Sequence, residues 1–167
     1  MRFKTNRLVV ADWQPELSGA SRAALDAAFA QILTPAVLAP LPPAAQSLDQ
    51  GVAGWIDRQA LLAQGLTIRL RDAGRIIGLA LVISPSSDDV HIGYLLAEDV
   101  WGQGLASELV PGLVEALKKR GETRVNAGVA VNNPASARVL LKAGFRQMPA
   151  PDGADVLRFQ MDFKAPS

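Results

Sequence analysis

The chain has 167 residues, of which 49% are hydrophobic and 20% are charged; this composition is typical of a folded globular domain. The formal net charge is +1, with no cysteine and one histidine, which argues against nucleic-acid binding and excludes disulfides and thiol chemistry. No apolar stretch has the length of a membrane span or a signal peptide. We therefore expect a cytoplasmic protein that binds no metal, nucleic acid or membrane.

The first part of the chain predicts one strand followed by a helical region. Residues 7–13 have the pattern of a strand, and the alanine-rich residues 17–33 have that of a helix. Residues 34–46 carry four prolines and are predicted to be a loop, because proline interrupts helices. A second helix is expected over residues 48–64, with Gly65 as its stop signal.

The period then changes from helical to alternating, which predicts a sheet. A hairpin is expected from residues 66–72 and 76–83, and a third strand over 90–96. Helices and strands alternate afterwards: helix 103–120, strand 124–131, helix 134–143, and strands 145–148 and 156–163. We expect an α/β (α+β) fold, with helices flanking a mixed, mostly antiparallel twisted sheet of six to seven strands. The strands on either side of the first of these helices should run parallel.

The stretch "DVWGQGLASELV", Asp99 to Val110, places small residues at the start of an amphipathic helix. Pro111 falls inside this helix and is expected to kink or open it. At its beginning, Gly102, Gly104 and Ala106 leave the backbone bare, and the first N–H groups of a helix have no partner within the helix. Aligned N–H groups of this kind bind phosphate. The stretch predicts an anion cradle; a simple tight turn is the alternative.

A second stretch, "VAVNNPASARVLLKAGF", Val129 to Phe145, makes the pattern specific. With it the chain resembles the GNAT N-acetyltransferase superfamily, and within it the branch that acetylates the N-termini of ribosomal proteins. Gly104 and Ala106 match the family's acetyl-CoA loop, Gln/Arg-x-x-Gly-x-Gly/Ala, and Trp101 stands at the Gln/Arg position. The second family segment is matched by Asn133, Ser136, Lys142, Gly144 and Phe145. The likeness covers the first strand and residues 66–145, and it is poor over residues 12–65.

The resemblance implies a single GNAT-type acetyltransferase domain over residues 1–167, with splayed central parallel strands that hold acetyl-CoA. Backbone groups near Leu95 and Leu96 would pair with the pantetheine arm. The N–H groups of residues 103–107 would hold the pyrophosphate. The cofactor-binding residues expected on this basis are Leu95, Leu96, Trp101, Gly102, Gln103, Gly104, Leu105, Ala106, Ser107, Asn133 and Ser136. The acetyl group would pass directly to a primary amine, without an enzyme-bound intermediate.

Two side chains are candidates for proton transfer in such a reaction. Ser136 stands where the family branch places a serine near the sulfur, as an acid or a donor to the departing thiolate; otherwise it is an ordinary residue of the helix first turn. His91 occupies the position of a catalytic glutamate in some superfamily members, with a surface histidine and a water chain as the alternative. Glu108 is expected to interact with the helix dipole, and Tyr94 to pack in the core.

The acceptor side is the least specified part of the sequence. Residues 20–65 are expected to cap the acceptor site, where Asp49 and Asp57 would attract an amine and Trp55 would belong to the core. The acceptor is a protein N-terminus or a small-molecule amine, and a homodimer remains open. Two alternatives remain: an acyl-CoA-binding sensor of the same fold without turnover, and an interaction module with an empty cradle.

Overall fold

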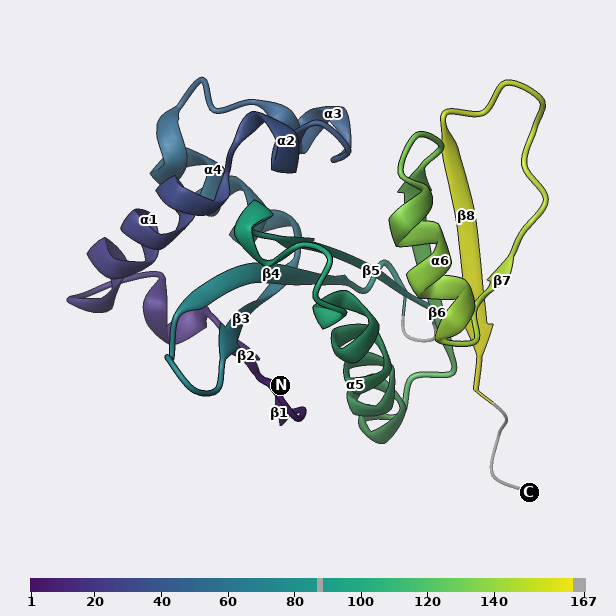
Figure 1. Ribbon diagram of the computed structural model, residues 1–167, viewed down its shortest axis with the longest axis horizontal. Helices are drawn as coiled ribbons and strands as arrows, with labels where there is room; N and C mark the ends of the chain where they lie inside the picture. Colours follow the sequence, from purple (N-terminus) through teal and green to yellow (C-terminus); the bar gives the residue numbers. More distant parts are fainter. Residues whose placement is uncertain (87–88, 164–167) are drawn as a thin grey trace.

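The computed structural model describes residues 1–86 and 89–163, and its strands form one twisted sheet (Figure 1). The strand order is β1-β2-β3-β4-β5-β6-β8-β7, and every neighbouring pair is antiparallel except β5–β6. The strands are β1 (Arg2–Lys4), β2 (Leu8–Asp12), β3 (Gln64–Leu70), β4 (Ile76–Ile83), β5 (Asp89–Leu96), β6 (Arg124–Ala130), β7 (Arg146–Gln147) and β8 (Val156–Asp162).

The mixed, mostly antiparallel sheet is confirmed, but it has eight strands within the described residues where six to seven were expected. The additional strand is β1, which pairs with β2 from Arg2↔Ala11 to Lys4↔Val9. Its three residues alternate between exposed and half-buried. A strand this short carries too few residues for an alternating pattern to be recognised, so its pairing depends on the neighbouring strand.

The parallel pair β5–β6 separates along its length. The two strands are in register from Asp89↔Arg124 to Ile92↔Ala127. Pairing stops there, although β5 continues to Leu96 and β6 to Ala130. The expected splayed central strands are therefore present. They open at their carboxyl ends, which in parallel strands lie at the same edge of the sheet.

The helices fall into two groups (Figure 1). The first group lies between β2 and β3: η1 (Gln14–Glu16), α1 (Ser21–Ile32), α2 (Pro35–Leu38), α3 (Pro43–Gln46) and α4 (Gly51–Leu62). The second group is η2 (Glu98–Val100), α5 (Leu105–Arg120) and α6 (Pro134–Lys142). Helix α1 packs against α4 and β4, and α5 packs against β1 and α6. None of the helices in the described part of the chain is long and apolar enough to cross a membrane.

Two expectations about the first helical group are wrong. The proline-rich segment is not a plain loop, because α2 and α3 each begin with a proline at the first helical position, where its missing N–H costs nothing. Gly65 does not end a helix; it lies buried in β3. A Cβ atom on Gly65 would lie 2.2 Å from the ring of Trp13, so glycine is needed there for close packing.

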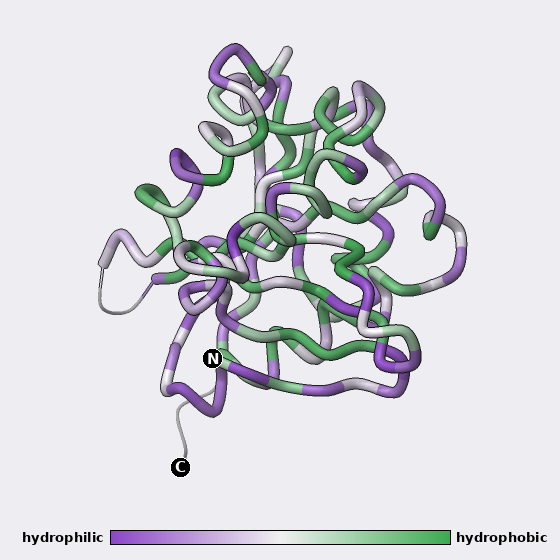
Figure 2. The backbone as a smooth tube through the Cα atoms, turned by 90° about the vertical axis from the view of Figure 1, so that its left-hand side faces the viewer, coloured by the Kyte–Doolittle hydropathy of each residue, from purple (hydrophilic) through white to green (hydrophobic). Residues whose placement is uncertain are grey.

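The core fills the space between the sheet and both helical groups. Apolar residues follow the strands, and the peripheral turns are hydrophilic (Figure 2). The rings of Phe29 and Trp13, and those of Phe29 and Trp55, have centroids 6.0 Å apart. All three side chains are buried, which confirms Trp55 as a core residue and makes this aromatic cluster the hydrophobic centre beneath α1 and α4.

Helix α5 has the expected amphipathic form. Its buried residues are Leu105, Leu109, Val110, Leu113 and Leu117. Gly121 ends it in the left-handed conformation at φ 100°, and Glu115 pairs with Lys119 on the outer face. The helix continues through Pro111 without interruption. Pro111 is exposed. Because proline has no backbone N–H, it donates no helical bond to the carbonyl of Ser107, four residues earlier.

Candidate active site

The split between β5 and β6 opens at the edge of the sheet where two of the predicted site segments lie. The loop that leads into α5 follows β5, and the Asn133–Ser136 segment that starts α6 follows β6. Because both strands end at this edge, the two helix N-termini lie beside the open end of the split. The loop before α5 and the Asn133–Ser136 segment, about 30 residues apart in the chain, therefore lie at the same edge of the sheet.

The backbone of β5 presents alternate residues to the split. A Cβ atom on Gly78 of β4 would lie 2.2 Å from the Leu95 carbonyl oxygen, so this carbonyl faces β4 and not the split. Backbone groups alternate between the two edges of a strand, so those of Tyr94 and Leu96 face the split. The Leu96 carbonyl accepts a 2.8 Å hydrogen bond from the indole N–H of Trp101. Of the two positions expected to pair with pantetheine, Leu96 has the appropriate orientation and Leu95 does not.

The cradle has the backbone geometry of an anion site. Gly102 and Gly104 have φ values of 75° and 77°, a left-handed conformation that glycine adopts at little cost. Gly104 is the N-cap of α5, and it has no side chain that could bond the first helical N–H groups. The first helical bond runs from the Glu108 N–H to the Gly104 carbonyl at 3.2 Å. The N–H groups of Leu105, Ala106 and Ser107 precede it and lie in the first turn, where helices leave such donors without an intrahelical partner.

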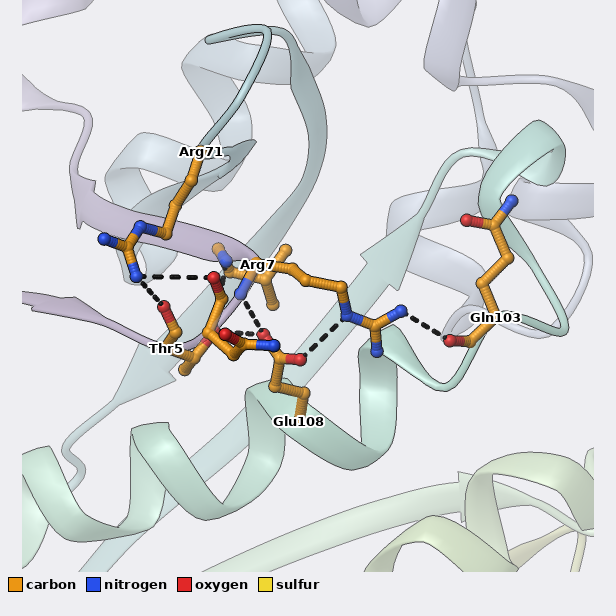
Figure 3. Close-up of polar contacts among 7 residues, drawn as sticks. Thr5, Arg7, Arg71, Gln103 and Glu108 are labelled. Carbon is orange, nitrogen blue, oxygen red and sulfur yellow. Dashed lines mark hydrogen bonds and ion pairs between the residues drawn. The ribbon is translucent and has the colours of Figure 1, made fainter.

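A polar clamp joins this first turn to the N-terminal corner of the sheet (Figure 3). Glu108 accepts bonds from the Thr5 hydroxyl, from the backbone N–H of Arg7 at 2.8 Å and from the Arg7 Nε at 2.9 Å. Arg7 Nη1 also donates to the Gln103 carbonyl at 2.9 Å. Desolvation raises the pKa of Glu108, but the bonds from Thr5 and Arg7 outweigh it and lower the pKa below the usual glutamate value. Glu108 is therefore a structural carboxylate and not a proton donor.

The second helix start carries a hydroxyl pair. Asn133 is the N-cap of α6, and its side-chain oxygen accepts from the Ser136 N–H at 3.4 Å, which confirms the capping role. The Ser136 hydroxyl and the Tyr94 hydroxyl are 2.8 Å apart. Burial raises the pKa of Tyr94, although the bond to Ser136 lowers it in part, so the phenol remains protonated at neutral pH. The two hydroxyls form a proton-bearing chain that joins β5 to α6.

His91 lies away from this pair. It is exposed and sits in the paired part of β5, opposite Asn126 of β6 and Ile83 of β4. Side chains alternate between the faces of a strand, so His91 is on the opposite face from Tyr94 and about 10 Å along β5 from it, at about 3.4 Å per residue. The structure therefore does not bring His91 and Ser136 together, and His91 could serve a reacting amine only from the face opposite α6.

The two acidic residues expected near the acceptor, Asp49 and Asp57, differ in their surroundings. Asp57 is paired with Arg22 at 2.8 Å, and Arg22 also binds Asp26 at 2.7 Å. Asp49 is exposed in the turn before α4. Asp57 is thus committed to joining α1 and α4, which reduces its attraction for an amine. No group of three or more histidine, aspartate or glutamate side chains within residues 1–86 and 89–163 could hold a metal ion.

The sequence reasoning missed two functional contacts. Tyr94 was expected to pack, yet its hydroxyl meets Ser136; the strand alternation places Tyr94 on the α6 face but says nothing of the partner. The contact between Arg7 and Gln103 joins residues far apart in the chain. A "TNR" segment ahead of a strand carries no local signal for it, because the contact depends on how β1 and β2 dock against α5.

Comparisons with known proteins agree with this geometry. The sequence matches the acetyltransferase (GNAT) domain over residues 16–146. No curated protein matches it significantly. Among solved structures, a GNAT-family acetyltransferase from Bacillus anthracis superimposes with a TM-score of 0.78 at 15% identity, over 97% of this chain and 98% of that one.

Two further neighbours act on ribosomal proteins according to their names. RimL, the ribosomal L7/L12 alpha-N-protein acetyltransferase solved with coenzyme A, has a TM-score of 0.76 at 19% identity, over 97% of this chain and 98% of that one. The ribosomal-protein-S5-alanine acetyltransferase of Vibrio fischeri has a TM-score of 0.73 at 18% identity, over 97% and 96%. At these identities the structural neighbours show the fold, and the sequence match shows the family: the chain belongs to the GNAT acetyltransferases.

Proposed function

We propose that the protein is an acetyl-CoA-dependent N-acetyltransferase that transfers the acetyl group directly to a primary amine. The observation that carries this proposal is the end of β5–β6 pairing at Ile92↔Ala127. Beyond this pair the strands separate; the cradle follows β5, and the Tyr94–Ser136 hydroxyl pair joins β5 to the start of α6. An extended thioester arm requires this combination of an open strand edge, an anion site and a proton donor.

The coenzyme would be held mainly by backbone groups. The first-turn N–H groups of Leu105, Ala106 and Ser107, with the Gln103–Gly104 loop, are offered to the pyrophosphate. The backbone groups of Tyr94 and Leu96 would pair with the pantetheine arm, as they would with a neighbouring strand. A Cβ on Gly102 would meet nothing within 4 Å, so the loop leaves the room that a bulky anion needs.

Ser136 supplies the hydrogen bond or proton that the departing sulfur needs. In the transfer, a neutral amine attacks the thioester carbonyl, the C–N bond forms, the C–S bond breaks and the thiolate leaves. The Tyr94 phenol can replace a proton that Ser136 gives up, because the two oxygens are 2.8 Å apart. N–H groups along the open edge of β5 are candidates to stabilise the oxyanion.

Removal of the amine proton is assigned to the opposite face of the sheet. His91 is the exposed imidazole there, and because it lies away from Ser136 it would receive the proton through water. The acceptor is a protein N-terminus or a small-molecule amine, in line with the names of two neighbours. The proposal places the enzyme in the cytoplasm as one domain over residues 1–167, with acetyl-CoA and the amine as its required partners.

The test combines calorimetry with coenzyme A and acetyl-CoA and a thiol-release assay against N-terminal peptides, polyamines, amino acids and aminoglycosides. Binding accompanied by thiol release on one amine class supports the proposal and names the acceptor. Saturable binding without release on any class contradicts transfer to an amine and favours the acyl-CoA sensor. Absence of coenzyme A binding at millimolar concentration contradicts both.

A further inference from the structure

We propose that Arg7, at the corner between β1 and β2, is a positioning residue for the coenzyme pyrophosphate. It holds the Gln103 carbonyl on the outer side of the cradle and neutralises Glu108 beneath the anion. The inference rests on the proposed function, because it concerns the same coenzyme site. It adds a side chain from the first strands, about 95 residues before the loop in the chain, to a site otherwise built from backbone.

The Arg7 guanidinium lies between the first turn of α5 and the loop that precedes it (Figure 3). Its Nε contacts Glu108 in the first turn of α5, and its Nη1 contacts the carbonyl of Gln103 in the loop, each at 2.9 Å. Its Nη2 lies 3.6 Å from the place that a Cβ on Gly104 would occupy. A planar guanidinium can make these contacts simultaneously, which the single ammonium of lysine cannot do with the same geometry.

The contact with Gln103 sets the direction of one peptide group. The described residues include no cis peptide bond, so the Gln103 carbonyl and the Gly104 N–H point in opposite directions. Since the carbonyl points at Arg7, the N–H points away from it. Gly102 and Gly104 flank the segment, and glycine permits a peptide to turn over easily. A turned peptide would present a carbonyl oxygen to the pyrophosphate, and Arg7 opposes that state.

The contact with Glu108 balances a charge. Glu108 is in the first turn of α5, and its side chain is only 18% exposed. A carboxylate there stabilises the helix start, but it also repels an anion bound at the same N-terminus. The pairing with Arg7 cancels most of this repulsion. The charge balance and the peptide orientation thus depend on the same side chain.

The backbone of the corner that carries Arg7 is also held from the side of Arg71, in addition to its bonds to Glu108. Arg71 donates to the carbonyl of Thr5 at 2.8 Å and to that of Asn6 at 3.3 Å. The Arg71 backbone N–H donates to the Arg7 carbonyl at 2.9 Å. Because Arg71, the residue after β3, holds the backbone of the corner, the guanidinium reaches the loop from a fixed backbone, which reduces the entropy lost on ordering it.

The experiment compares two acetyl donors in wild type and R7M. Acetyl-CoA carries the pyrophosphate, and S-acetylpantetheine carries the thioester arm alone. With any acceptor that the wild type uses, R7M should raise KM for acetyl-CoA and Kd for coenzyme A by roughly tenfold to a hundredfold, the range expected when the Glu108 charge near the anion is no longer neutralised. It should leave kcat with acetyl-CoA unchanged. It should also leave kcat/KM with S-acetylpantetheine unchanged, because this donor does not reach the cradle.

Three further variants sharpen the comparison. R146M removes an exposed arginine that pairs with Asp162 at 2.9 Å on β8, and it should bind coenzyme A as the wild type does. R7K keeps the positive charge but lacks the several N–H donors of the guanidinium. It should bind coenzyme A less tightly than wild type but more tightly than R7M. In R7M/E108Q the unpaired carboxylate is gone, so part of the lost coenzyme A affinity should return.

The outcomes separate this inference from the proposed function. If wild type binds no coenzyme A, the proposed function is wrong and Arg7 has no coenzyme to position. If wild type binds but R7M binds equally well, the inference alone is wrong. If R7M loses activity equally with both donors, Arg7 is a structural brace and does not act through the pyrophosphate. If R7M does not fold, R7K decides between these outcomes with the same two donors.

Discussion

A negative charge placed at Gly104 should abolish tight coenzyme binding, and the size of the effect can be worked out from the cradle. Gly104 has a φ of 77°, and a Cβ there would meet only the Arg7 guanidinium, at 3.6 Å. Gly104→Asp therefore fits sterically and costs about 1–2 kcal/mol of left-handed strain, near the lower limit since aspartate tolerates this region. This strain is the same with and without ligand, so it lowers stability and leaves affinity almost unchanged.

The loss of affinity comes from charge. A carboxylate about 4 Å from a phosphate charge is repelled by roughly 1 kcal/mol in water and about 4 kcal/mol near a protein surface. The loop is exposed, which favours the lower part of this range, and the pyrophosphate carries more than one charge. We expect the Kd for coenzyme A to rise about tenfold to a hundredfold, since each 1.4 kcal/mol is a factor of ten. If the new carboxylate binds Arg7 instead, it still disrupts the contact with Gln103.

Calorimetry with coenzyme A measures this loss directly, with Gly104→Ala and Gly121→Asp as controls. The alanine variant carries the strain without the charge. Gly121 is also left-handed, at φ 100°, and a Cβ there meets nothing within 4 Å; it lies at the far end of α5, about 24 Å away at 1.5 Å per residue. Both controls should bind nearly as wild type does. Unchanged affinity in a folded Gly104→Asp variant would refute the cradle assignment.

Three other predictions follow from the site. Ser136→Ala should lower kcat by about 10²-fold, the lower range for general acid catalysis, and adding Tyr94→Phe should lower it little further because the hydroxyls act as one chain; multiplicative losses would show that they act separately. Tyr94 is the one tyrosine in the sequence, so ultraviolet titration of the native protein should show a midpoint above the usual value of about 10, returning to that value in denaturant. Because burial raises the folded-state pKa, the corresponding stability is present below the unfolded pKa and is lost as pH rises through the folded one; a native midpoint equal to the denatured one would contradict this. Coenzyme A should change tryptophan fluorescence through Trp101, which is 50% exposed while Trp13 and Trp55 are 1% and 0% exposed; a change that persists in Trp101→Phe would disprove the contact.

Much of the fold was predictable because each element carries a local pattern. The leucines of α5 recur every four residues and are buried in the structure, and the hairpin of β3 and β4 follows the change from helical to alternating period. Gly102 and Gly104 predicted the left-handed turn before α5, because positive φ values are properties of a few consecutive residues. The match to the GNAT domain confirms the family that these motifs indicated.

Other features had no local signal. The strand β1 is three residues long and is defined by its partner. The proline-rich segment contains short helices because its prolines fall at first helical positions and the Thr34 side chain caps α2. The orientation of Leu95 and Leu96 depends on the register with β4, and a one-residue change of register would exchange the groups that face the split.

The sequence by itself determined the order of most elements, the family, the position of the glycine turn before α5 and the absence of thiol chemistry, because periodicity, glycine conformation and composition are local properties. Only the tertiary structure decided which distant groups meet. The Tyr94 and Ser136 hydroxyls come together across the split, and Arg7 reaches Gln103 from the other end of the chain. Such contacts depend on how the sheet edge, the corner and the helix dock against one another, and docking is a property of the packed core as a whole.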